Sequence, residues 1–216
     1  MSFALHIDNL DFRYNDRPVF SGFNLAMERG RHHLLLGPSG SGKTSLLNLI
    51  CGFATPNSGI ISVAGARMTG LSERQRDALR RDHIGVVFQT LRLVSALDVL
   101  GNLRLAAKLA GVRPDDAHIA ELLDRLGLVH KLHAYPRTLS QGEAQRAAIA
   151  RALVSCPGLL IADEPTSALD NANMEKVAQL LLDTAEQTGA TLLVATHDER
   201  LTPYFDAAVR LEGAPA

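Results

Sequence analysis

A glycine-rich segment that ends in lysine and threonine carries the clearest chemical pattern in this sequence. It has the form G-x-x-x-x-G-K-[ST], with the apolar residues 34–36 before it and helically spaced residues 45–50 after it. Such a loop between a strand and a helix binds phosphate, because its N–H groups and the helix N-terminus face the same anion. The sequence therefore predicts a nucleoside triphosphate site, whose binding residues are Gly37, Pro38, Ser39, Gly40, Ser41, Gly42, Lys43, Thr44 and Ser45.

The charged and hydroxyl side chains of this loop have separate expected tasks. Lys43 is expected to reach the β- and γ-phosphates, and the Thr44 hydroxyl to complete the shell of a Mg²⁺ ion. Two acids, Asp163 and Glu164, end the apolar run 159–162 further along the chain. Two acids after a strand are commonplace alone. Downstream of a phosphate-binding loop, the first is expected to hold Mg²⁺ and the second to polarise the attacking water.

A second anion site is indicated at the start of another helix. Ser140 and Glu143 have the spacing of a capping box, so Ser140 is expected to cap the helix that follows. A serine hydroxyl, the Gly142 backbone and free N–H groups at a helix N-terminus bind an anion well. Taken alone, this pattern favours the alternative, a well-capped helix that binds nothing.

These residues need a scaffold, and the apolar runs indicate one. Continuous runs are typical of strands buried on both faces of a parallel sheet. A helix over 172–187 separates the last two runs, and alternating strands and helices favour a parallel α/β sheet. The expected strands are 33–36, 83–88, 159–162 and 191–195.

The remaining segments flank this sheet. The N-terminal part reads as β-rich, with strands over 4–14, 19–27 and 60–65. Residues 90–137 read as a helical insertion, and a helix over 141–155 leads back to the sheet. We therefore expect one domain over 1–216 with a helical subdomain at about 90–157.

The overall composition excludes several classes of protein. With 216 residues, 46% hydrophobic and 21% charged, the chain can bury a sizeable core and is not expected to be disordered. The net charge of −1 gives no bulk attraction to nucleic acid or to an anionic membrane. No apolar stretch reaches the roughly 18–20 residues that span a bilayer, and residues 1–6 lack the charged region and apolar run of a secretory signal. We expect a soluble intracellular protein.

Two further features are expected to have only structural roles. Cys51 and Cys156 lack the spacing of a metal or redox site and are expected to be buried, reduced thiols. A helix over 72–81, with Ser72 as its cap, carries arginines interleaved with acids. Such a pattern indicates a solvated face of mixed charge, in preference to a nucleic-acid patch.

Several motifs together resemble one known family. Residues 139–146 resemble the signature motif of ATP-binding-cassette (ABC) ATPases. In the same order along the chain, Gln89 is similar to the family's Q-loop glutamine, residues 167–170 to its D-loop, and His197 to its switch histidine. The signature departs from the usual Gly-Gly, since Gln141 stands in the first position.

Two other positions are compared with the family. Tyr14 resembles the aromatic residue that stacks on adenine, with Phe12 as the competing candidate. Gly101 stands where a similar segment often carries an acid before the asparagine. The family's fold is α/β: a P-loop NTPase core with a mostly parallel sheet, an N-terminal antiparallel β subdomain and a helical insertion.

The resemblance implies ATP and Mg²⁺ as cofactors and assigns the site. Thr44, Gln89 and Asp163 are the implied metal ligands. Ser140 and Gly142 would come from a facing second copy and contact the γ-phosphate, so that ATP joins two chains and hydrolysis releases them. The implied catalytic residues are Glu164, His197, Gln89 and Lys43.

The resemblance also implies partners and a location. An integral membrane permease is expected, with the cassette peripheral on the cytoplasmic face of the inner membrane, and no nucleic acid is expected. Residues 71–74, residues 79–89 and the chain's end soon after His197 resemble the lipoprotein-release and macrolide-export branch. The alternatives are an importer ATPase for small solutes and a soluble ATPase acting on DNA or ribosomes. A homodimer of this chain is the simpler expectation, and a heterodimer with a different cassette is the alternative.

Overall fold

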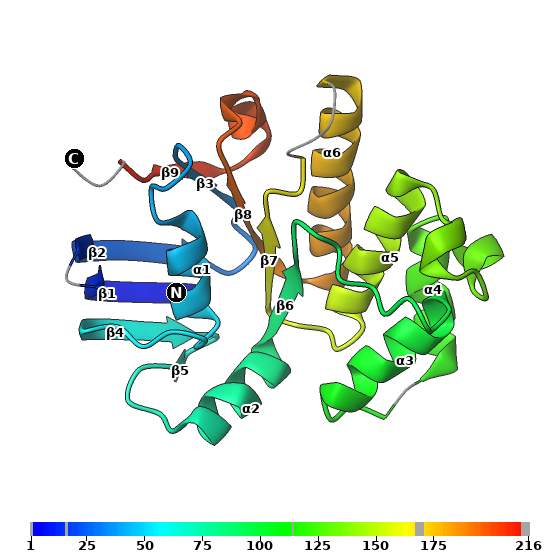
Figure 1. Cartoon of the computed structure of the whole chain (residues 1–216), viewed down its shortest axis with the longest axis horizontal. Coiled ribbons are helices and arrows are strands. Elements are labelled where there is room, and N and C mark those ends of the chain that lie inside the picture. Colours follow the sequence, from blue (N-terminus) through cyan, green and yellow to red (C-terminus); the bar gives the residue numbers. More distant parts are fainter. Residues whose placement is uncertain (1, 16, 114, 167–170, 213–216) are drawn as a thin grey trace.

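A five-stranded parallel sheet forms the centre of the computed structural model, which describes residues 2–15, 17–113, 115–166 and 171–212 (Figure 1). Every neighbouring pair of its strands is parallel, so the carboxyl ends of the strands lie along one edge. Loops that leave this edge from different strands converge on one region of the surface. In spatial order the strands are β6 (Ile84–Val87), β7 (Leu159–Asp163), β8 (Thr191–Thr196), β3 (His33–Leu36) and β9 (Ala207–Arg210).

A four-stranded antiparallel sheet lies beside the parallel one, with helix α1 between them (Figure 1). This arrangement matches the α/β fold expected from the sequence. The order in space is β2 (Arg17–Glu28), β1 (Phe3–Tyr14), β4 (Ser58–Val63) and β5 (Ala66–Arg67).

The described ranges contain six helices, and three of them lie in the chain between β6 and β7, where the sequence predicts a helical insertion. Three single 3-10 segments, η1 (Val129–Lys131), η2 (Pro136–Thr138) and η3 (Glu199–Tyr204), complete the described elements. None of the helices in the described ranges is long and apolar enough to cross a membrane. The helices are α1 (Lys43–Ile50), α2 (Glu73–His83), α3 (Val99–Leu109), α4 (Asp116–Arg125), α5 (Gln141–Leu153) and α6 (Asn171–Thr188).

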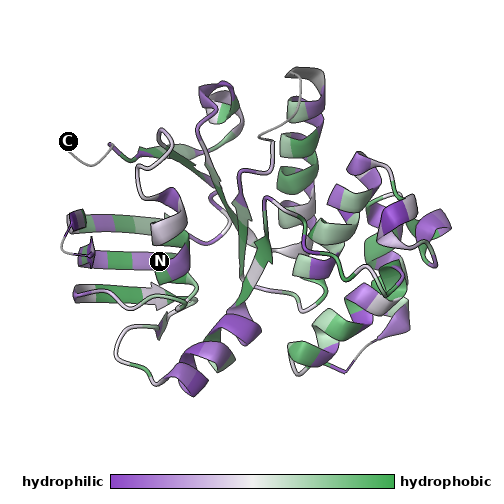
Figure 2. Cartoon of the chain, viewed as in Figure 1, coloured by the Kyte–Doolittle hydropathy of each residue, from purple (hydrophilic) through white to green (hydrophobic). Residues whose placement is uncertain are grey.

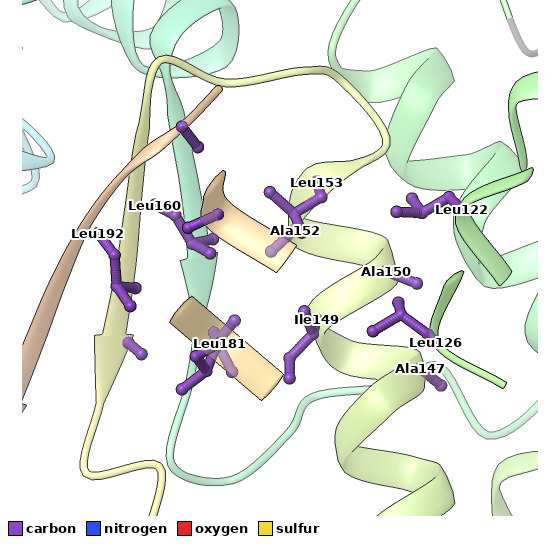
Figure 3. Close-up of a cluster of buried hydrophobic side chains, with 14 of the residues drawn as sticks. Leu122, Leu126, Ala147, Ile149, Ala150, Ala152, Leu153, Leu160, Leu181 and Leu192 are labelled. Atoms are coloured by element: carbon purple, nitrogen blue, oxygen red, sulfur yellow. The ribbon is translucent and has the colours of Figure 1, made fainter. Parts of the chain in front are cut away.

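The central strands carry continuous apolar runs because each of their faces is buried in a different hydrophobic cluster. Leu160 and Ala162 of β7 pack with α5 and α6 (Figure 3). Leu159 and Ile161 of the same strand pack on the opposite face, with α1 and the antiparallel sheet. Figure 2 shows the result as hydrophobic central strands beside a hydrophilic α2. Burial on two faces explains the continuous runs in the sequence.

Some sequence predictions are wrong in detail. The strand expected over 83–88 is only Ile84–Val87, because His83 ends α2. The strand expected over 60–65 begins and ends two residues earlier. Strands β5 and β9 have no counterpart among the predictions. The division into a core and a helical subdomain at about 90–157 stays a prediction.

The two cysteines differ from each other. Cys51 is buried, and that burial raises the pKa of its thiol to about 12. Cys156 is exposed, so the expectation of two buried thiols is wrong for this residue. It lies in the segment between α5 and β7, with its Sγ 3.6 Å from Nε2 of His118.

Candidate functional site

A pocket of about 480 Å³ opens where the loops after β3, β6, β7 and β8 converge. Segments far apart in the sequence meet here, as the motif order predicts. The pocket brings together most of the predicted nucleotide site, from residues on the antiparallel sheet, the phosphate-binding loop and three strand ends. Its lining residues are Tyr14, Val19, Ser39, Gly40, Gly42, Lys43, Thr44, Ser45, Gln89, Glu164 and His197.

The shape of the phosphate-binding loop depends on its glycines. Gly40 has φ +83° and Gly42 has φ +97°, a region that side-chain-bearing residues rarely adopt. A Cβ added to Gly42 would lie 2.8 Å from Cγ1 of Val19. The loop therefore curls as an anion cradle only with glycine at this position.

The loop delivers the positive end of helix α1 to the pocket. Gly42 is the N-cap residue, the first turn holds no acid, and no side chain in the described part of the chain caps this helix. The N–H groups of the first turn have no partner within the helix, and the helix dipole adds positive charge there. An anionic group in the pocket satisfies both. Ser41 is buried, and its hydroxyl has no hydrogen-bond partner among the described residues.

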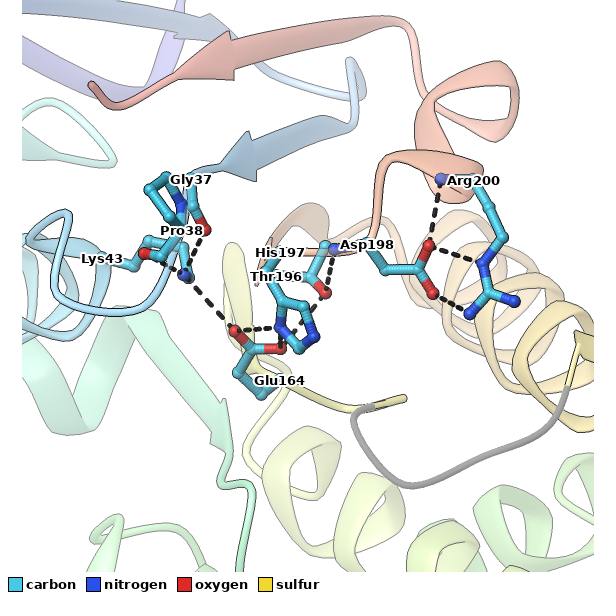
Figure 4. Close-up of polar contacts among 8 residues, drawn as sticks. All are labelled: Gly37, Pro38, Lys43, Glu164, Thr196, His197, Asp198 and Arg200. Atoms are coloured by element: carbon cyan, nitrogen blue, oxygen red, sulfur yellow. Dashed lines mark hydrogen bonds and ion pairs between the residues drawn. The ribbon is translucent and has the colours of Figure 1, made fainter. Parts of the chain in front are cut away.

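Lys43 is held in place by two carbonyls of its own loop. Its side chain is only 7% exposed. The ammonium Nζ donates to the carbonyl oxygens of Gly37 at 2.6 Å and Pro38 at 3.1 Å (Figure 4). Nζ also lies 3.5 Å from Oε1 of Glu164, which comes from the end of β7. The Lys43 ammonium therefore points across the pocket, and Lys43 is one of its lining residues.

Glu164 is also bound from the β8 side (Figure 4). The Thr196 hydroxyl donates to Oε2 of Glu164 at 3.2 Å. Nδ1 of His197 lies 3.0 Å from the same oxygen. A lysine, a threonine and a histidine therefore converge on one carboxylate, and the His197 ring, 56% exposed, stays accessible.

The backbone at Glu164 is strained. Its φ is +46°, although it is not glycine and it precedes Pro165, which disfavours this conformation further. The Glu164 N–H donates to the carbonyl oxygen of Ala195 at 2.8 Å. Strain of this kind costs about 1–3 kcal/mol and is found where a side chain must be aimed for function.

Asp163 precedes Glu164 but does not line the pocket. Burial raises the pKa of its carboxyl above the ordinary value, the neighbouring Glu164 adds to this, and Lys43 opposes it. A divalent cation at this point would relieve the repulsion between the two carboxylates. The half-buried carboxyl is therefore suited to a metal.

The donor set expected for Mg²⁺ is chemically suitable. Thr44, Gln89 and Asp163 offer a hydroxyl, an amide and a carboxylate, and Mg²⁺ prefers oxygen ligands. No group of three His, Cys, Asp or Glu residues in the described ranges could hold a metal unaided. This fits Mg²⁺, which is commonly bound by one or two carboxylates together with phosphate oxygens.

The two aromatic residues that are candidates for stacking on adenine occupy different environments. Tyr14 is 67% exposed and lines the pocket. Phe12 packs against the buried cluster under the antiparallel sheet. An exposed ring at the pocket wall is free to stack on a base, so the geometry favours Tyr14.

The signature residues lie elsewhere on the molecule. Ser140 caps α5, and the predicted capping box is present: the Glu143 N–H donates to Oγ of Ser140 at 3.3 Å, and the Ser140 N–H donates to Oε2 of Glu143 at 2.8 Å. Hydrogen bonds from Ser140 and the nearby Lys131 lower the pKa of Glu143 to about 2. Ser140 and Gly142 line a separate pocket of about 350 Å³, which shares no lining residue with the first.

The sequence reasoning missed several residues that contact the site. Val19 forms part of the pocket wall, and Thr196 binds Glu164. The sequence could have indicated Thr196 as a site residue, because it ends the apolar run just before His197. Residues 167–170, expected as a D-loop, lie outside the described residues.

The chain is similar to known proteins in both sequence and fold. The family model of ABC transporters matches residues 20–167. An uncharacterized ABC transporter ATP-binding protein of Mycobacterium tuberculosis is 40% identical, covering 97% of this chain and 87% of its own length. A lipoprotein-releasing system ATP-binding protein of Bacteroides fragilis, LolD, is 34% identical, covering 96% and 97%.

A solved structure has the same fold. It is a dimeric ATP-binding cassette in a post-hydrolysis state bound to ADP and phosphate. Its sequence is 31% identical to this chain, its TM-score is 0.84, and the match covers 98% of this chain and 97% of that one.

Proposed function

This chain belongs to the ABC transporter family and is an ATPase subunit of such a transporter, and we propose that it powers a separate permease of the lipoprotein-release or export type. The 34% identity over nearly the full length of a lipoprotein-releasing ATP-binding protein supports this branch. Transporters of this branch perform mechanical work on envelope substrates, and the permease determines which substrate is taken.

One observation carries the assignment of the site. The pocket that contains the phosphate-binding loop also contains Glu164 and His197. Lys43 exchanges its contact with Glu164 for the β- and γ-phosphates, and the N-terminus of α1 stabilises the same negative charge. Tyr14 stacks on the base at the open end of the pocket. The phosphate-binding loop and the N-terminus of α1 are in place before the reaction, which is what makes electrostatic stabilisation effective.

The metal site is assigned to Thr44, Gln89 and Asp163. The Thr44 hydroxyl is on the first turn of α1, and the Asp163 carboxylate ends β7. Mg²⁺ held by these residues would neutralise negative charge that develops on the phosphates during the reaction.

Glu164 and His197 act on the water and the γ-phosphate. Released from Lys43, the Glu164 carboxylate accepts a hydrogen bond from the attacking water and orients it. His197, whose Nδ1 lies 3.0 Å from Oε2 of Glu164, holds the γ-phosphate beside that carboxylate. The strained backbone at Glu164 keeps its carboxylate turned into the pocket.

Each site is completed by a second copy of the chain. Ser140 and Gly142 lie in a pocket of their own, away from the loop that binds phosphate in the same chain. Placed against the γ-phosphate of a facing chain, the capped N-terminus of α5 supplies another set of N–H donors. Nucleotide held between two chains then favours the closed dimer by its differential affinity for that state.

We place the subunit on the cytoplasmic face of the membrane, bound there through its permease. The test is to purify the Glu164→Gln chain with ATP from membranes of its native cell. This variant binds ATP and accumulates as the closed dimer, and a Lys43→Ala, Glu164→Gln double variant serves as the matched control that does not bind nucleotide.

Recovery of an integral membrane protein with a large extracytoplasmic domain, absent from the control, is the expected result. Recovery of a solute permease would favour the importer alternative. Ribosomes or DNA in place of any membrane protein would contradict the transporter role. Rapid steady ATP turnover by Glu164→Gln would remove Glu164 from its catalytic role.

A further inference from the structure

A buried glutamine on α5 is bonded to the backbone beside Glu164. Gln145 is 6% exposed, and its Nε2 donates to the carbonyl oxygen of Pro165 at 2.7 Å. Pro165 follows Glu164 directly in the chain. Gln145 lies one turn after Ser140, the residue that caps α5. The amide therefore joins the helix of the signature motif to the segment that carries Glu164.

This hydrogen bond holds a segment that local preferences do not hold. Glu164 has φ +46°, and a residue before proline favours an extended conformation instead. On its N-terminal side Glu164 is anchored by its N–H, which donates to Ala195. On its C-terminal side the Gln145 amide binds the Pro165 carbonyl. Without that bond the backbone around Glu164 loses the hydrogen bond on its C-terminal side, and the Pro165 carbonyl loses the amide that donates to it.

Gln145 also faces the second pocket. It lines that pocket together with Ser140 and Gly142, where the nucleotide of the facing chain is proposed to bind. The buried Gln145 side chain thus lines the pocket that contains Ser140 and also binds the segment that follows Glu164. Because the side chain is packed, a shift of α5 is transmitted to Pro165.

We propose that Gln145 is a positioning residue for ATP hydrolysis, which fixes the Glu164 carboxylate and couples it to the facing chain's nucleotide through α5. The inference rests on the proposed function, since it needs Glu164 to act on water and Ser140 to act in the facing site. Gln145 itself contacts no reacting atom.

The test compares Gln145→Met with the wild-type chain. Methionine keeps the length and the apolar packing of the side chain but removes the N–H donor. The expected result is a fall in kcat of roughly ten- to hundredfold, since misplacing a catalytic group by about 1 Å costs up to a hundredfold. KM for ATP and the ATP-dependent dimer are expected to change less than about twofold, because Lys43, Thr44 and Ser140 are unchanged in this variant.

Two controls separate positioning from folding. Gln179→Met removes a hydrogen bond of the same 2.7 Å length, from Gln179 Nε2 to Oδ1 of Asp183 on the exposed side of α6, and is expected to leave kcat unchanged. Ile149→Val removes a buried methyl group one turn further along α5 and is expected to lower stability while leaving kcat unchanged. If the methionine variant does not fold, Gln145→Asn, one methylene shorter, is measured in its place.

The outcomes distinguish this inference from the proposed function. Normal kcat in a folded Gln145→Met chain, with Glu164→Gln inactive, overturns the positioning role alone. An equal loss of kcat in Ile149→Val also overturns it, because general loosening of α5 then explains the effect. A wild-type chain without ATPase activity, or an active Glu164→Gln chain, overturns both.

Discussion

Two glycines of the phosphate-binding loop form a matched pair for testing how the loop is built. Gly40 and Gly42 both have positive φ, +83° and +97°. A Cβ on Gly40 meets nothing within 4 Å, whereas a Cβ on Gly42 lies 2.8 Å from Val19 Cγ1 and 3.1 Å from Phe20 Cζ. Valine is stiff about χ1, and Phe20 is buried, so neither neighbour moves away easily.

The two substitutions to alanine should therefore differ in cost. Each substitution lowers the free energy of unfolding by about 1–2 kcal/mol, because alanine must adopt the left-handed backbone. Gly42→Ala lowers it by about 1–3 kcal/mol more, because the added methyl group overpacks the site. Its free energy of unfolding should fall by about 2–5 kcal/mol in total. For a chain of this size each kcal/mol lowers Tm by about 2–4 °C.

The assay is urea and thermal unfolding of the nucleotide-free chains, with the double variant Gly42→Ala, Val19→Ala completing a cycle. Removing Val19 Cγ1 should recover the overpacking, so the double variant should be more stable than the sum of the single losses by about 1–3 kcal/mol. Equal losses for the two glycine variants, or a coupling of zero in the cycle, would refute the steric argument.

Three further outcomes follow from other contacts. Lys43→Ala should abolish ATP binding in calorimetry while the chain stays folded; unchanged affinity would contradict the phosphate site. Asn102, 2% exposed, donates to the carbonyls of Val94, Leu97 and Asp98, so Asn102→Ala should cost about 3 kcal/mol in urea unfolding. His32 accepts a hydrogen bond from the Leu192 N–H, and burial lowers its pKa despite opposing acids. As the pH falls, the unfolded chain therefore binds a proton at His32 before the folded chain does. The contribution of His32 to the free energy of unfolding should be fully present above pH 6.5 and should decrease below it. The fall in the urea midpoint between pH 7.5 and 5.5 should shrink in His32→Gln; an unchanged fall would assign it to other histidines.

The parts of the fold that could be predicted are those with a local signal. β7 and β8 are buried on both faces, which leaves unbroken apolar runs in the sequence. The glycine spacing of residues 37–44 and the acids after β7 mark the site in the same local way. By contrast, β9 has alternating half-buried and exposed residues over only four positions, and it exists because it pairs with β3 across the sheet edge.

The contacts that tune the site had no such signal. The positive φ of Glu164 depends on Ala195 and on the bond from Gln145 to Pro165, which joins residues 20 positions apart. Glutamine on a helix is ordinary in sequence, and nothing local distinguishes a buried one. Pairing of this kind is decided by tertiary packing, which single-sequence patterns do not contain.

The central claim, that each catalytic site is shared between two copies, is tested most directly by mixing two inactive variants. Glu164→Gln lacks the catalytic carboxylate, and Ser140→Arg lacks the signature contact. In a mixed dimer one site is intact, because Glu164 comes from one chain and Ser140 from the other. With random pairing half of the dimers are mixed and one of their two sites works, so ATPase activity should recover to about a quarter of wild type. No recovery in a mixture shown by cross-linking to contain mixed dimers, or full activity of Ser140→Arg alone, would contradict the shared site.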